Sequence, residues 1–113
     1  MFRKYELLWR TDISVTSKTV SNNVSGSQYA TSGTATVTLN FSSVENYAKL
    51  TSDNFRVAFS GVSGYGDSNV YAGASSASIS SYNANTGVVT VRYTWSAREN
   101  QTSAATIIVF CFS

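Results

Sequence analysis

The chain contains no histidine and no proline, and it has a single cysteine, Cys111. Without histidine, one chain cannot form a Ser-His-Asp or Cys-His catalytic arrangement, and the usual histidine-containing zinc sites are excluded as well. A lone cysteine cannot close an intrachain disulfide, so no oxidised framework supports the fold. Because Cys111 stands between Phe110 and Phe112, it is predicted to be a small buried thiol rather than a nucleophile.

Charged residues are also scarce, at 12% of the chain, about half of the roughly 25% usual for soluble domains. Among the basic residues only Arg3, Lys4 and Arg10 lie close together, so the basic stripe typical of nucleic-acid binding is missing. No pair among the six acidic residues is distinguished by its spacing, and Asp67-Ser68-Asn69 offers too few oxygens for a calcium site. We therefore expect no catalytic residue, no cofactor, no metal and no nucleic-acid partner.

Long apolar runs are missing too. The N-terminal sequence MFRKYELLWRTD contains only Leu7, Leu8 and Trp9 as an apolar run, whereas a secretory signal needs about 7–15 apolar residues. No stretch approaches the roughly 20 residues that a membrane-spanning helix requires. The expectation is a protein made in a cytoplasm, with no signal peptide, no transmembrane segment and no membrane partner.

Hydroxyl side chains are abundant, since serine and threonine make up 33 of the 113 residues. Hydrophobic residues account for 42% and aromatic residues for 13%, which is enough for one packed core. Thr, Val and Tyr favour strands, while Ser and Asn favour turns. This composition predicts an all-β protein with a single domain over residues 1–113.

Alternating apolar and polar residues mark the strands that we expect. The alternation is clear in 34–41, 55–59 and 88–95, and each of these segments would bury one face. The segments 5–10 and 12–20 are less regular, and residues 1–10 form either a first strand or an N-terminal arm. About seven short strands predict an antiparallel β-sandwich, Ig-like or jelly-roll-like, with a small barrel as the alternative.

The segment 105–112 differs from the other strands because both of its faces are apolar. Such a strand is either central and covered on both sides or part of an interface. We therefore predict an assembly surface at Ile108, Phe110 and Phe112. The expected edges also lack proline and carry few lysines, which favours a homo-oligomer, and Arg3 and Lys4 would dock the basic N-terminal segment on an acidic neighbour.

Turn and helix signals fall between these segments. Residues 83–87 end in a glycine that can adopt the positive φ of a hairpin loop, and the pairs 22–23 and 32–33 are predicted to be two further turns. Ser42 and Glu45 fit a capping box, which predicts one short helix near residues 43–50.

The stretch SGVSGYGDSNVYAGASSAS, residues 60–78, is rich in glycine, serine and tyrosine. Its glycines do not lead from a strand into a helix, and the negative charge of Asp67 would repel phosphate, so a nucleotide loop is rejected. Tyrosines among small polar residues are typical of recognition loops. Two interpretations of the 61–75 loop remain: a slack connection at the rim of the sandwich, or a recognition loop that uses Tyr65, Asp67, Asn69 and Tyr71.

The pattern Tyr82-Asn-Ala-Asn-Thr-Gly87-Val-Val-Thr-Val91 resembles a strand-turn-strand element of small β-sandwich proteins in tailed-bacteriophage virions. It is also similar to bacterial Ig-like domains of surface proteins. The resemblance covers one hairpin by motif and the rest of the chain by composition, so it carries no functional residue over to this sequence.

The resemblance implies a non-enzymatic structural protein of a phage virion, such as a head decoration, head fibre or tail accessory protein. Its partners would be other virion proteins and further copies of itself, and it would be located in the virion. The alternative is a carbohydrate-binding or adhesive module that holds a surface glycan with the tyrosine-rich loop. Both hypotheses use the same fold, which does not by itself decide between them.

Overall fold

The computed structural model describes residues 14–29, 31–59, 72–98 and 100–113. These residues form six strands and two short 3₁₀ helices, and they contain no α-helix. In chain order the elements are β1 (Val15–Ser25), β2 (Thr31–Asn40), η1 (Tyr47–Lys49), η2 (Ser52–Asn54), β3 (Phe55–Phe59), β4 (Ala72–Asn83), β5 (Val88–Ala97) and β6 (Thr102–Phe112).

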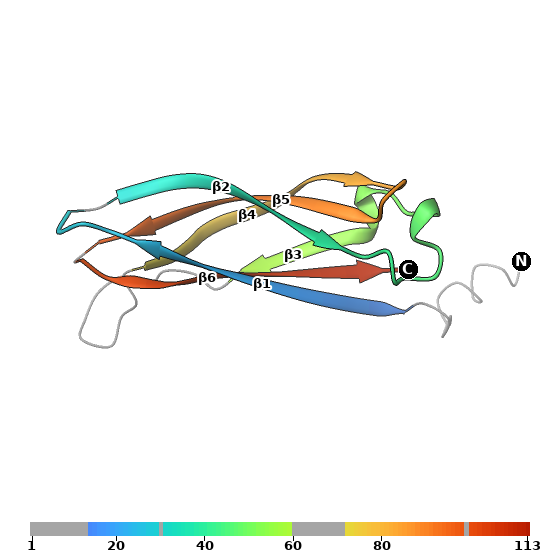
Figure 1. Cartoon of the computed structure of the whole chain (residues 1–113), viewed down its shortest axis with the longest axis horizontal. Helices are drawn as coiled ribbons and strands as arrows, with labels where there is room; N and C mark the ends of the chain where they lie inside the picture. Colours follow the sequence, from blue (N-terminus) through green and yellow to red (C-terminus); the bar gives the residue numbers. More distant parts are fainter. Residues whose placement is uncertain (1–13, 30, 60–71, 99) are drawn as a thin grey trace, which may run out of the picture.

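The strands form two three-stranded antiparallel sheets with the orders β1-β6-β3 and β2-β5-β4. The two sheets run lengthwise against each other (Figure 1), and β4 packs across the core against both β3 and β6. The prediction of an all-β antiparallel sandwich is confirmed, with six strands in the described residues instead of about seven. The segment 5–10, expected as a strand or an arm, lies outside the described residues.

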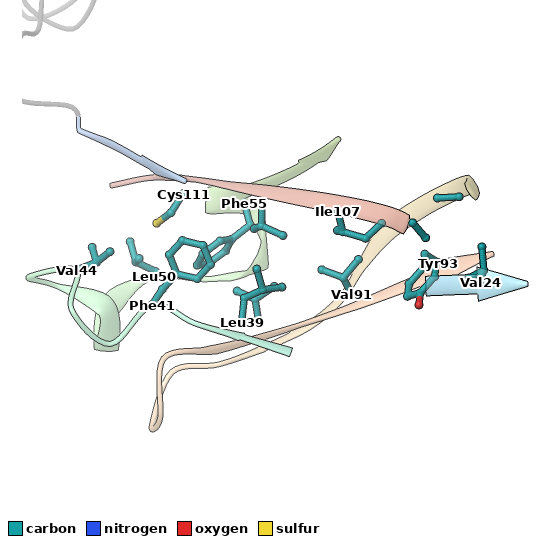
Figure 2. Packing of buried hydrophobic residues seen from close by; sticks show 14 of the residues in the cluster. Val24, Leu39, Phe41, Val44, Leu50, Phe55, Val91, Tyr93, Ile107 and Cys111 are labelled. Carbon is teal, nitrogen blue, oxygen red and sulfur yellow. The ribbon is translucent and has the colours of Figure 1, made fainter. Parts of the chain in front are cut away.

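The core lies between the sheets and follows the predicted alternation. On β5, Val89 and Val91 are completely buried and Tyr93 is nearly so, while β6 buries Ile107 and Val109 from the facing sheet. Figure 2 shows Val91, Tyr93 and Ile107 pointing into the space between the strands of the two sheets. Alternate residues of a strand point to opposite faces, so the period-2 pattern placed the apolar residues inside.

Aromatic rings fill one end of this core. The ring centroids of Phe41 and Phe55 lie 5.3 Å apart in an edge-on arrangement, and the Phe55 and Tyr82 centroids lie 4.7 Å apart. Both distances fall in the range of favourable aromatic contacts. The rings come from the residue that follows β2, from β3 and from β4, so they join the two sheets.

The predicted hairpin turn at residues 83–87 is confirmed. It joins β4 to β5, and Gly87 has a φ of 77°, a conformation that glycine adopts without a steric penalty. The Gly87 amide donates to the carbonyl of Asn83 at 2.8 Å, and the Gly87 carbonyl accepts from the amide of Phe41 at 2.7 Å. The turn therefore closes the hairpin and also anchors the chain that leaves β2.

The short helix predicted near residues 43–50 is present only as the three-residue 3₁₀ helix η1, and no α-helix forms there. That segment forms turns and η1, and η2 follows it. The capping box is found at Thr51 and Asn54 of η2, not at Ser42 and Glu45. Val44 and Leu50 are both buried, yet six residues along a continuous α-helix would place them about 120° apart around its axis. Burial of both residues favours a folded-back segment over a helix.

The two additional turns expected at residues 22–23 and 32–33 are wrong. Asn22 and Asn23 lie within β1, and Ser32 and Gly33 lie within β2. Each pair continues the ladder to its neighbouring strand without a break. Pairing with a long partner strand has overridden the local turn preference of Asn and Gly.

Candidate interaction surface

The side chains of β6 divide between the core and the outside of the sandwich. Ala105, Ile107, Val109 and Cys111 point inward and are buried. The alternating residues Ile108 and Phe110 are half-buried, and Phe112 remains 41% exposed. β6 is the central strand of its sheet, but it is not covered on both sides as the first predicted alternative required, because its outer side chains stand on the outer face of that sheet and Phe112 remains exposed.

Neighbouring strands extend this apolar face. In the ladders, Phe110 lies between Ser17 and Arg56, Ile108 lies between Thr19 and Ala58, and Phe112 lies opposite Val15. Val15 is 56% exposed, so the apolar row reaches the edge of the sheet at β1. We call Val15, Ala58, Ile108, Phe110 and Phe112 the outer stripe.

Arg56 is the charged residue beside the outer stripe, and its guanidinium group donates hydrogen bonds to the protein's own backbone. Its Nη1 donates to the carbonyls of Asp53 and Phe55, at 2.8 Å each. On the opposite side of Phe110, β1 presents the neutral, exposed side chains of Ser17 and Thr19. The described part of this face is therefore apolar along its centre, neutral on its β1 side and singly charged on its β3 side, which is the character of a protein-contact surface.

A hollow of about 440 Å³ lies at the end of the sandwich where β1 begins and β6 ends. It is lined mainly by hydroxyl and amide groups and by one carboxylate, that of Glu45: Ser14, Thr16, Ser43, Val44, Glu45, Asn46 and Ser113. A single carboxylate provides neither an acid–base pair nor a set of metal ligands. Over the whole described part of the chain, no three Asp, Glu, Cys or His side chains are grouped so that they could hold a metal ion.

The structure places only some of the predicted site residues. Ile108, Phe110 and Phe112 lie together on one face, as the sequence predicted. Arg3 and Lys4 of the expected docking arm, and the recognition-loop residues Tyr65, Asp67, Asn69 and Tyr71, lie outside the described residues. The predicted loop 61–75 is too long at its C-terminal end, because residues 72–75 already belong to β4.

Cys111 is completely buried in the core, in agreement with the sequence-based prediction. Burial raises the pKa of its thiol, because a thiolate is poorly stabilised away from water. A raised pKa keeps the thiol protonated at neutral pH, whereas a nucleophilic cysteine requires a lowered one.

The sequence analysis did not single out two structurally important polar residues. Lys18 of β1 points toward the core side, and its Nζ lies 5.9 Å from the centroid of the Phe41 ring. Tyr82 donates its hydroxyl hydrogen to the carbonyl of Tyr47 in η1. Burial, and to a lesser degree Cys111 and Tyr47, raise the pKa of the Tyr82 phenol. The signal that could have found Lys18 is its spacing. It lies two residues before Val20, so it falls on the same strand face, where alternation predicts an apolar residue.

Comparison with known proteins adds no relative from which a function could be inferred. No protein-family model matches the chain, and no curated protein and no solved structure matches it either. Among the described residues, no helix has the length and apolar character needed to cross a membrane.

Proposed function

We propose that this chain is a non-enzymatic structural protein that acts through protein–protein contacts made by the outer stripe. The observation that carries the proposal is the exposure of apolar side chains on the outer face of a central strand, where Phe112 is 41% exposed and the adjoining Val15 is 56% exposed. Outer faces of antiparallel sheets are usually polar when they meet water. An apolar row at this position gains free energy when a partner covers it.

The partner that we propose is a second copy of the same chain. The face presents one arginine held by its own backbone, with neutral serine and threonine beside the apolar row. Two such faces can meet about a twofold axis with little repulsion between like charges, and twofold dimers are the commonest homo-oligomers.

The assembly that we propose is a tailed-phage virion, with the protein as a head or tail accessory component. Support comes from the hairpin of residues 82–91, whose pattern resembles such proteins. The sandwich fold is compatible with that role and with many others. Stoichiometric presence of the protein in purified particles of the phage that encodes it would support the virion assignment. Its absence from those particles would contradict the assignment.

The contact surface is tested by substituting two residues of the outer stripe together, as I108T/F112T. Threonine keeps the β-branched preference for a strand while it removes apolar area. The matched control is V88T, an apolar-to-threonine change on the outward side of the other sheet, where Val88 lies opposite Asn40 and Asn83. Circular dichroism and a thermal melt verify that all variants remain folded.

Light scattering after size exclusion measures the mass of each variant. We expect an oligomer for the wild type and for V88T, and dissociation toward monomer for I108T/F112T. A wild-type protein that is monomeric at all concentrations would contradict the proposal. So would an I108T/F112T variant that keeps the wild-type mass.

A further inference from the structure

Within the described ranges of the chain, the two three-stranded sheets leave four edge strands, namely β1, β3, β2 and β4. An edge strand presents unpaired N–H and C=O groups, which form a template for pairing with another chain. Natural proteins protect such edges by shortening them, by bulges, or by charged residues, including charges that point inward. The four edges of this protein are not protected equally.

Two edges are protected by their geometry. The ladder between β4 and β5 is interrupted twice, between Ala74 and Ser76 and between Ile79 and Ser81, so the outer edge of β4 is irregular. Bulges of this kind increase the local twist and disturb pairing. β3 is only five residues long and carries Arg56. Neither strand offers a long, regular edge.

The β1 edge is protected by charge. Lys18 is half-buried on the core side of β1, and its Nζ lies 5.9 Å from the Phe41 centroid. A strand added beside β1 would have to cover this ammonium group and separate it further from water. An inward-pointing lysine is therefore a barrier to edge pairing.

The β2 edge has none of these devices. The strand is ten residues long, with the sequence TSGTATVTLN, and it contains neither a charged residue nor proline. Its register with β5 runs without interruption from Thr31 to Asn40. Thr34, Thr36 and Thr38 are exposed on its outward side, and threonine has a high preference for strands. Among the four edges β2 is long, regular and neutral.

We propose that β2 is a second assembly surface, at which it pairs antiparallel with β2 of another copy of this chain. Pairing about a twofold axis would join two β2-β5-β4 sheets into one continuous six-stranded sheet. β2 is suited to pair with β2 of a second copy. Antiparallel pairing sets its threonine row against an identical neutral row, and cross-strand threonine pairs are favourable. This inference extends the proposed assembly role but uses a surface separate from the outer stripe.

Disulfide trapping tests the pairing directly. Thr34, Thr36 and Thr38 are each replaced by cysteine in the full-length chain, and the variants are oxidised singly and in the mixtures T34C with T36C and T36C with T38C. Residues opposite each other in an antiparallel ladder have Cα atoms about 4.5–5.5 Å apart, which lies within the range that a disulfide bridges. The single variants and mixtures together cover every twofold axis between residues 34 and 38.

The matched control is S78C. Ser78 and Thr36 lie on either side of Arg92 in the ladders and both are exposed, but Ser78 belongs to the irregular edge of β4. We expect covalent dimers on a non-reducing gel for one or two of the β2 combinations and none for S78C. Equal crosslinking of S78C and the β2 variants would indicate random collision and overturn the proposal.

Repeating the disulfide trapping in the I108T/F112T background distinguishes the contribution of the β2 edge from that of the outer stripe. If the β2 crosslink persists there, the edge contact is independent of the outer stripe. If no β2 combination crosslinks while the wild type is an oligomer sensitive to I108T/F112T, the β2 inference is wrong and the outer stripe stands.

A charge substitution gives a second readout. Thr36→Lys places a lysine on the β2 edge, and Ser78→Lys places the same charge on β4, at the position paired with Arg92 from the other side. We expect T36K to weaken association at least tenfold in a sedimentation concentration series, and S78K to leave it within twofold. Equal effects of the two lysines would contradict pairing at β2.

Discussion

Trp95 of β5 packs over Gly33 of β2, directly opposite it in the ladder. A Cβ atom built on Gly33 would lie 2.8 Å from the Cε2 and Cζ2 atoms of the indole ring, which is closer than two carbon atoms can approach without displacement. An aromatic ring that covers a glycine on an edge strand is a known way to restore the packing that the glycine lacks. Gly33 is therefore part of the packing of β2 and not a turn.

Gly33→Ala is expected to lower the free energy of unfolding by about 1–2 kcal/mol, because the indole must move away from the new methyl group. Urea denaturation followed by circular dichroism measures the loss. Tryptophan fluorescence in a W9F background, where Trp95 is the remaining indole, should show a changed emission maximum for the variant.

The contact between the two residues is tested with a double-mutant cycle. In a Trp95→Leu background the glycine no longer faces an indole, so G33A should be nearly neutral or slightly stabilising. A coupling energy near zero would contradict the packing relationship.

Tyr82→Phe should lower the free energy of unfolding by about 1 kcal/mol, because it leaves the carbonyl of Tyr47 without the hydroxyl donor while the ring is kept. That hydrogen bond ties β4 to η1. Tyr29→Phe is the control, since the Tyr29 side chain is 75% exposed and its change should stay within about 0.5 kcal/mol. Equal effects of the two substitutions, measured by urea denaturation, would show that the Tyr82 hydroxyl contributes nothing specific.

The stability of the protein should fall as the pH rises above about 8.5, the usual pKa of a cysteine thiol. Burial raises the pKa of Cys111 in the folded state. The unfolded chain therefore releases the thiol proton first, and alkaline pH favours unfolding until the folded-state pKa is passed. The stabilising contribution of the protonated, buried thiol is complete below the unfolded-state pKa. It is lost progressively as the pH rises from there through the folded-state pKa.

Chemical denaturation at pH 7, 8, 9 and 9.5 measures this dependence. In Cys111→Ala the decline between pH 8 and 9.5 should become shallower, although the variant is less stable at every pH because of the cavity that it leaves. Parallel profiles for the wild type and the variant would exclude the thiol as the cause.

Lys18→Val should create a new association surface at β1. The substitution removes the inward-pointing charge and leaves an eleven-residue edge strand with a β-branched residue in place of the lysine. The control is Thr16→Val, a change on the same strand and the same face. In light scattering, K18V is expected to have a higher mass than the wild type, and T16V the wild-type mass. An unchanged mass for K18V would mean that the lysine does not protect the edge.

The parts of the fold that depend on local pattern could be predicted from the sequence. The inward faces of residues 34–41, 88–95 and 105–112 follow from period-2 alternation, and the hairpin at 83–87 follows from its glycine. The outer stripe at Ile108, Phe110 and Phe112 was predictable for the same reason, since a strand with two apolar faces must cover both.

Predictions that rested on a short local signal were less reliable. The Ser42 and Glu45 pair suggested a helix, but burial of Val44 and Leu50 from a folded-back segment stabilises the structure more than the few hydrogen bonds of one or two helical turns. Asn22 and Gly33 suggested turns, but each lies within a long strand whose partner satisfies its backbone groups.

The sequence by itself determined that this protein is all-β, which residues line its core and that β6 has a second apolar face, because these properties depend on neighbours along the chain; it favoured a sandwich but left a barrel open. Only the tertiary structure decided which strands lie at the edges, that Lys18 points inward at β1 and that Trp95 covers Gly33. Those relationships join residues that are far apart in the chain, and they depend on strand order, which the alternation of side chains does not encode. The contrast between the protected β1 edge and the unprotected β2 edge comes from that order.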